Sequence, residues 1–292
     1  MITVRYLVLY YANYVIIIHR VPRRSRAMAP TSEIPPRWAD ETFIEYGREP
    51  MHPQLRAHES IEQALARGCT GAPVASKWVL PLTPAEWHFQ LMPSPAEADV
   101  TCGKQGFDTA GWGTIHVPMS WQMAETTADQ PLYTNYRYPF GGKAESLKQL
   151  PVPRGEGNSV GTYQTEFALP DAWNGRRVLL QLDGVDSNAT VWMDGVEVGY
   201  SQDSRLPAEF DVTEACARAT RGARVSGEHT LSVRCHRFCD GSYLEDQVKA
   251  LGACREDVGL RLCAHATANA RAPACVAGHV VAVGDSSARA PV

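Results

Sequence analysis

The chain has 292 residues, of which 44% are hydrophobic and 21% are charged, an ordinary composition for a folded globular protein that excludes disorder over most of its length. Its formal net charge of -4 argues against a nucleic-acid partner, because such proteins present a basic face. A chain of this length holds one or two domains whose cores need no disulfide or metal. None of the 8 cysteines forms a C-x-x-C pair, so the sequence predicts no zinc knuckle.

An apolar run of about 15 residues, at positions 4–18, is shorter than the roughly 20 residues of a membrane-spanning helix. Most of the nearby arginines follow this run, which reverses the charge order of a secretory signal peptide. We therefore expect that the protein does not associate with a membrane and that its main body lies in the cytoplasm. Met28 offers a second start just after the arginines. Residues 1–30 are interpreted as a leader that is unstructured or an artefact.

Residues 31–100 are expected to form an extended N-terminal arm followed by the first strands. The sequence is rich in proline and polar residues from 31 to 55, which suits a segment lying along a larger body. The residues ESIEQALAR at 59–67 favour a short helix. Residues 78–89 predict a strand pair interrupted by Pro81 and Pro84, and a linker follows.

Residues 101–247 show the alternation and turns of an antiparallel β-domain. Ile115 and Val117 have the two-residue period of a half-buried strand, and residues 162–169 repeat it. Asp194-Gly195 lies between two apolar runs, which is among the strongest hairpin signals. Short strands with a turn about every ten residues indicate a sandwich or barrel. We predict an all-β fold, a jelly-roll sandwich with poorly ordered N- and C-terminal segments.

Four phrases make the sequence more specific than a generic sandwich: IHVPMSWQM, PLYTNYRYPF, GVDSNATVWMDGVEVGYSQDSRLPAEFDVT and DGSYLEDQ. In order and spacing they resemble the first, sugar-binding domain of glycoside hydrolase family 2 β-galactosidases of the lactose-cleaving type. The resemblance covers residues 38–247 and is strongest from 115 onward. It implies a galactose-binding-like jelly roll and a role in the hydrolysis of terminal β-galactosides such as lactose.

The resemblance also implies a role for Asn135. In the family, the asparagine of the YTN-x-x-YP segment hydrogen-bonds the galactosyl group, and Asn135 occupies that position. A turn asparagine that caps the loop before Pro139 is the alternative, which the residues alone leave open.

The resemblance implies a structural magnesium site as well. The glutamine of YSQDSR and the aspartate of DGSY help to hold the ion in related enzymes, and these residues match Gln202 and Asp240. Oxygen donors suit this cation, although Asp240-Gly241 is also an ordinary turn. Arg205 and Glu209, four residues apart, are expected to form a structural ion pair.

The sequence departs from the family at Val248, where family members have an aspartate that contacts both the galactosyl group and a sodium ion. A valine supplies no oxygen, so we expect the sodium site to be lost. Residues 248–292 contain no Phe, Tyr or Trp, and we predict a disordered tail that forms no second domain and leaves an unpaired sheet edge.

Catalysis by a retaining glycosidase needs two carboxylates about 5 Å apart. In the family both come from a later barrel domain of roughly 250 residues, so we expect the 292-residue chain to be inactive alone. The expected partners are a β-galactoside and either the missing catalytic portion of the enzyme or further copies of the chain. Two alternatives are a non-catalytic carbohydrate-binding module and an interaction fragment that complements a separate catalytic part.

Overall fold

The computed structural model describes twelve stretches of the chain, namely residues 7–11, 14–18, 36–40, 42–52, 58–65, 76–98, 101–125, 127–131, 157–204, 206–220, 224–242 and 277–283. The chain divides into two compact units, Met1–Pro35 and Pro36–Val292. None of the helices in the described stretches combines the length and the apolar character required to cross a bilayer.

The first unit contains an antiparallel pair of strands. In it, β1 (Leu7–Tyr11) pairs with β2 (Tyr14–Ile18), with Leu7 opposite Ile18. Aromatic and β-branched residues are frequent in both segments and have high intrinsic strand propensity. The interpretation of residues 1–30 as a leader stays a prediction.

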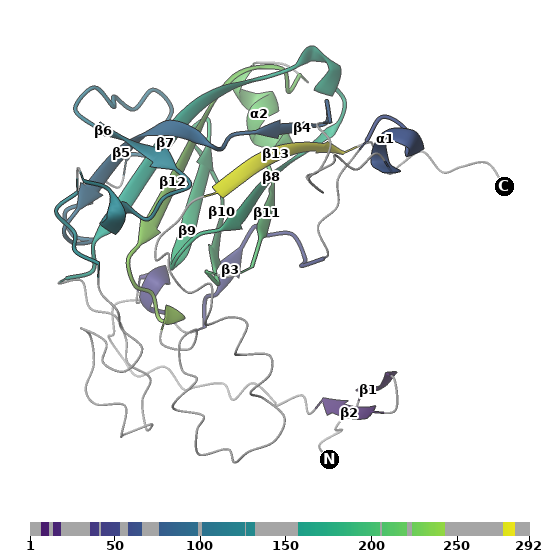
Figure 1. Ribbon diagram of the computed structural model, residues 1–292, viewed down its shortest axis with the longest axis horizontal. Helices are drawn as coiled ribbons and strands as arrows, with labels where there is room; N and C mark the ends of the chain where they lie inside the picture. The colour runs from purple at the N-terminus through teal and green to yellow at the C-terminus, as the bar shows by residue number, and fades with distance from the viewer. Residues whose placement is uncertain are drawn as a thin grey trace. The chain divides into compact units, whose positions relative to one another are not determined.

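The second unit is a sandwich of two sheets (Figure 1), and every strand pairing in them is antiparallel. The larger sheet has the order β3-β10-β9-β12-β7-β5-β6 and the smaller one β11-β8-β13-β4. The strands of the larger sheet are β3 (Glu45–Tyr46), β5 (Ala85–Met92), β6 (Gly113–Val117), β7 (Val160–Leu169), β9 (Asn188–Met193), β10 (Val196–Gln202) and β12 (Gly227–His236). Those of the smaller sheet are β4 (Val79–Pro81), β8 (Arg177–Gly184), β11 (Ala208–Asp211) and β13 (Ala277–Val283).

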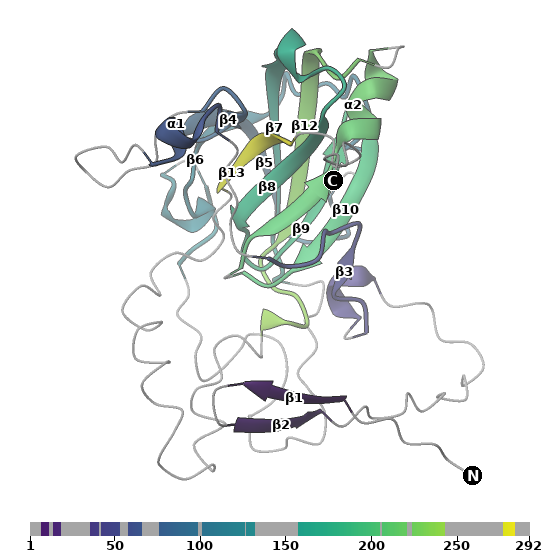
Figure 2. The same cartoon turned by 90° about the vertical axis from the view of Figure 1, so that its right-hand side faces the viewer.

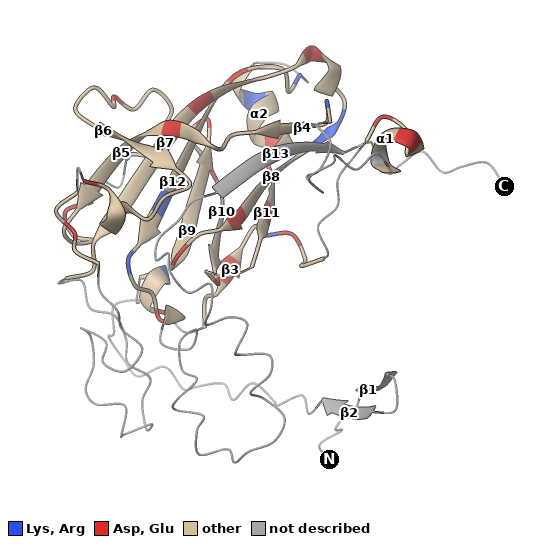
Figure 3. Ribbon diagram, in the orientation of Figure 1, with Lys and Arg blue, Asp and Glu red and all other residues tan. Residues whose placement is uncertain are grey.

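The helices that the structure describes in the second unit are short. In these described stretches, two are α-helical, α1 (Ile61–Leu65) and α2 (Thr213–Ala219), and three are 3-10 turns, Arg37–Ala39, Trp121–Met123 and Asp171–Trp173. Helix α2 lies near β8 (Figure 2). Lys and Arg are interspersed with Asp and Glu along the described elements (Figure 3).

The core lies between the two sheets. It receives every second residue of the facing strands, including Leu231 and Val233 of β12 and Leu180 and Leu182 of β8. This alternation follows from the two-residue period of a strand, which sends one set of side chains inward. The antiparallel sandwich predicted from the sequence is therefore confirmed.

The predicted hairpin is also confirmed, since β9 and β10 pair with Met193 opposite Val196. Asp194 and Gly195 have φ angles of 50° and 81°. Two successive positive φ values are typical of a type I′ turn, whose twist matches that of the strands it joins.

The structure places β4 and β13 where the sequence does not predict them. Residues 78–89 do contain two strands, but β4 joins the smaller sheet and β5 the larger one. Within the predicted tail, Ala277–Val283 forms β13 and pairs with both β8 and β4. A strand that enters an existing sheet obtains its hydrogen bonds from its neighbours and needs no core of its own. Composition alone therefore does not exclude it.

The N-terminal arm, residues 36–52, lies along the edges of both sheets. Its strand β3 pairs with β10, with Tyr46 opposite Tyr200. Two residues later, Arg48 forms a bridge with Phe210 of β11. Because β11 is the edge strand of the smaller sheet and β3 extends the larger one, the arm connects the two sheets along one side of the sandwich.

Candidate functional site

The structure brings together the two residues for which the sequence predicts a magnesium site. Gln202 Nε2 donates a hydrogen bond of 2.7 Å to Asp240 Oδ1, although 38 residues separate them. Both side chains are buried, with relative exposures of 6% and 8%. Asn135 and Val248 lie outside the described residues, so the sugar contact and the lost sodium contact stay predictions.

Gln202 and Asp240 owe their positions to a strand end and a turn. Gln202 is the last residue of β10 and lies on the same face as Tyr200, whose hydroxyl accepts a 2.9 Å hydrogen bond from Gln202 Nε2. Asp240 lies in the turn after β12, where Cys239 and Ser242 exchange two hydrogen bonds. A β-carbon on Gly241 would stand 3.1 Å from Gln202 Oε1, so glycine permits this close approach.

The arm covers the Gln202–Asp240 pair through its backbone carbonyls. The backbone N–H of Asp240 donates to the carbonyl of Trp38 over 3.0 Å, and that of Gln202 donates to Ile44 over 3.0 Å. The Trp38 ring also stacks on His236, with ring centroids 5.5 Å apart. The pair is therefore enclosed by strand, turn and arm together.

Burial keeps the neighbouring titratable groups neutral. It raises the pKa of Tyr200, with a further contribution from Cys239, so the phenol retains its proton. Tyr200 can then donate to the carbonyl of Arg37, 3.4 Å away, while it accepts from Gln202. Burial lowers the pKa of His236 to about 3, and the charge of Arg234 acts in the same direction. Asp240 thus accepts a hydrogen bond from a neutral amide, which in turn donates to a neutral phenol.

The donor set fits a hard divalent cation at two of its ligand positions. A carboxylate oxygen and an amide oxygen are ligands that magnesium and calcium accept. Gln202 presents its nitrogen to Asp240, and a half-turn of the amide would present Oε1 there instead. Two acceptor oxygens facing each other would require a cation between them. Gln202 and Asp240 can therefore act as a pair of ligands, with arm carbonyls close by.

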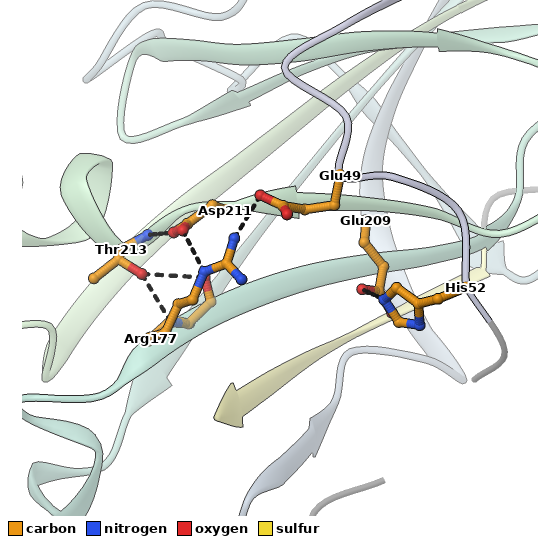
Figure 4. A network of polar contacts seen from close by, with 7 residues as sticks. Glu49, His52, Arg177, Glu209, Asp211 and Thr213 are labelled. Atoms are coloured by element: carbon orange, nitrogen blue, oxygen red, sulfur yellow. Dashed lines mark hydrogen bonds and ion pairs between the residues drawn. The ribbon is translucent and has the colours of Figure 1, made fainter. Parts of the chain in front are cut away.

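A second group of polar contacts anchors the arm to the smaller sheet (Figure 4). Arg177 on β8 contacts Asp211 through Nε at 2.7 Å and Glu49 of the arm through Nη2 at 2.5 Å. Asp211 also accepts from the backbone N–H of Thr213 at the start of α2. These contacts to Asp211 and Glu49 raise the pKa of Arg177, which stays charged.

The structure gives Glu209 of β11 a partner in the arm. Its carboxylate lies 2.9 Å from His52 Nε2 (Figure 4). Arg205 lies outside the described residues, so its ion pair with Glu209 stays a prediction.

Sequence reasoning missed the part that Trp38, Tyr200 and Glu49 have in this region. Tyr200 could have been found, because it lies two residues before Gln202 and so shares its face of β10. Trp38 and Glu49 had no such signal. Their contacts are with residues more than a hundred positions away.

Comparison with known proteins identifies what this region is similar to. Residues 83–260 match the family described as glycosyl hydrolases family 2, sugar binding domain. A β-galactosidase of Psychromonas ingrahamii is 41% identical over 162 residues, which are 56% of this chain and 14% of that protein. A β-galactosidase of Alteromonas mediterranea is 33% identical over 213 residues, which are 72% of this chain and 18% of that protein. The chain thus spans a small part of the length of these relatives.

Among solved structures, a β-glucuronidase of Bifidobacterium dentium in complex with coumarin-3-O-glucuronide aligns with 70% of this chain and 30% of its own. The identity is 20% and the TM-score is 0.39.

Proposed function

Because this chain belongs to glycosyl hydrolase family 2 and contains the sugar-binding domain of that family, we propose that it is the sugar-binding part of a β-galactosidase. Its substrates are terminal β-galactosides, with lactose as the representative one, and it acts in the cytoplasm. The observation that carries the proposal is the identity of 41% over 162 residues to a protein named β-galactosidase.

In this proposal the chain's residues bind and position rather than cleave. Asn135 hydrogen-bonds the galactosyl group, and Gln202 and Asp240 hold a structural magnesium ion under the arm. The second assignment is supported by the contact between the two side chains, each of which carries an oxygen that suits a hard cation. Val248 carries no oxygen and takes no part in a sodium site. The ion would supply charge neutralisation and rigidity, so that the turn after β12 keeps its shape.

Cleavage requires two carboxylates about 5 Å apart on either side of the anomeric carbon. We propose that a catalytic barrel supplies both and that the 292-residue chain hydrolyses no β-galactoside by itself. Turnover of a chromogenic β-galactoside that scales with the concentration of the purified chain would contradict this. An Asn135→Ala chain serves as control, because activity unchanged by this substitution would point to a contaminating enzyme.

Sugar binding is tested by titrating the full chain with galactose, with glucose as the matched control sugar. We expect saturable binding of galactose that Asn135→Ala weakens at least tenfold while the thermal unfolding temperature stays the same. Equal affinity for both sugars, or an unchanged affinity in Asn135→Ala, would contradict the assigned contact.

An interaction fragment is the second candidate, favoured by an arm that attaches to both sheets through Tyr46 and Arg48. An enzyme that lacks its own sugar-binding domain should then regain activity when mixed with the chain. A carbohydrate-binding module would bind galactose and restore no activity, so the two measurements together separate the candidates.

A further inference from the structure

Three chemically reactive side chains meet inside the sandwich, away from Gln202 and Asp240. Asp194 comes from the β9–β10 turn, Cys216 from α2 and His229 from β12. One ligand atom from each lies within 4.8 Å of the other two. Cys216 is fully buried, and the His229 and Asp194 side chains have relative exposures of 0% and 5%.

The hydrogen bonds of His229 indicate which of its ring nitrogens is available to a metal ion. Nε2 lies 2.8 Å from the carbonyl oxygen of Val225, and since a carbonyl only accepts, Nε2 carries a hydrogen. Nδ1 lies 2.7 Å from Asp194 Oδ2. A lone pair on Nδ1 would repel that carboxylate oxygen, so Nδ1 carries a proton in this arrangement, and a metal ion that replaces the proton could bind both atoms.

The ring of His229 is fixed in orientation, because Nδ1 faces Asp194 and Nε2 faces the carbonyl oxygen of Val225. Asp194 is held in place as well, because its Oδ1 accepts a 2.8 Å hydrogen bond from the backbone N–H of Thr230. The acceptors are thus oriented before any ion binds.

The thiol of Cys216 adds a third type of ligand atom to the histidine–aspartate pair. Nitrogen, sulfur and carboxylate oxygen together are the ligand set of zinc, with bonds of about 2.0 to 2.3 Å. Tetrahedral ligands at those lengths lie roughly 3.3 to 3.6 Å apart, so closing this cluster needs movements of about 1 Å. A backbone carbonyl on the second ring nitrogen, here that of Val225, is the usual outer partner of a metal-bound histidine.

We propose that Asp194, Cys216 and His229 form a structural site for a zinc-type divalent cation, which cross-links the β9–β10 turn, α2 and β12. The site is independent of the sugar-binding function. Because the three groups are buried, the ion enters while the chain folds.

The test is refolding of the full chain in cobalt chloride, with cobalt as a spectroscopic substitute for zinc. We expect one retained cobalt per chain and a thiolate-to-cobalt absorption band in the near ultraviolet. Cys216→Ser should lose the band, whereas Cys102→Ser should keep it, because Cys102 is equally buried but contacts Arg234. Refolding in magnesium chloride should leave no retained ion at this site.

Absence of the band in the refolded wild-type chain would overturn the proposal, as would a band that survives in Cys216→Ser. If Cys216→Ser fails to fold, X-ray absorption of the zinc-loaded wild-type chain decides. One sulfur at about 2.3 Å from the zinc supports the site, and a shell of nitrogen and oxygen alone refutes it.

Discussion

The backbone of Gly47 lies directly against the carbonyl oxygen of Val198. A β-carbon on Gly47 would stand 2.2 Å from that oxygen, and the φ angle of +66° is one that glycine adopts readily and other residues rarely do. Glycine at this position therefore lets the arm pass close to β10 between its contacts at Tyr46 and Arg48.

Replacing this glycine should loosen the arm. We expect Gly47→Ala to lower the free energy of unfolding by about 1 to 3 kcal/mol, because the new methyl group meets backbone and the residue is forced into a strained conformation. Urea denaturation followed by tryptophan fluorescence measures the effect. Gly111→Ala is the control, since a β-carbon there meets nothing within 4 Å. Equal stability of both variants would show that the arm does not depend on this approach.

Magnesium should stabilise the chain through Gln202 and Asp240. Thermal unfolding of the wild-type chain is expected to shift upward as magnesium chloride is added, because an ion that binds only the folded state stabilises it by mass action. Asp240→Ala should abolish the shift and Gln202→Ala should reduce it. Asp171→Asn is the control, because it removes an exposed carboxylate that does not belong to the Gln202–Asp240 pair, and it should leave the shift in unfolding temperature intact. A shift that Asp240→Ala retains would refute the assignment.

Acid should destabilise the fold through His236. Its pKa is about 3 in the folded chain and near 6.5 when unfolded, so the unfolded state takes up a proton that the folded state does not. The stability contributed by the neutral ring is complete above pH 6.5 and is lost as the pH falls towards 3. At pH 5 the loss relative to pH 8 should be about 2 kcal/mol.

The matched variant for this prediction is His236→Asn, whose side-chain amide can replace the Nδ1 contact with Asn188 without titrating. Its unfolding free energy should fall less steeply than that of the wild type between pH 6.5 and 4. Parallel curves for the two proteins would assign the acid sensitivity to other groups.

The contact between Arg177 and Glu49 should contribute modestly to docking of the arm. Both side chains are partly exposed, with relative exposures of 44% and 27%, so solvent screens the pair. A double-mutant cycle with Arg177→Met and Glu49→Gln is expected to give a coupling of about 0.5 to 1 kcal/mol that decreases in high salt. A coupling that salt does not change would mean that packing rather than charge holds the pair.

Much of the sandwich could be predicted because its signals are local. The alternation at Ile115 and Val117 and the Asp194-Gly195 turn depend on neighbours in sequence, and the structure shows both as expected. The arm could be predicted to be extended but not where it would attach. Its pairing with Tyr200 and Phe210 brings together backbone segments that no sequence period relates.

The sequence by itself determined the fold class and the family, because strand periodicity, turn chemistry and the four family phrases are written in consecutive residues. It also singled out Gln202 and Asp240. Only the tertiary structure decided which groups surround them, that Glu209 contacts His52, and that Asp194, Cys216 and His229 share one buried cluster. These contacts join distant parts of the chain, and their geometry is set by how two sheets and an arm pack, which no local pattern encodes.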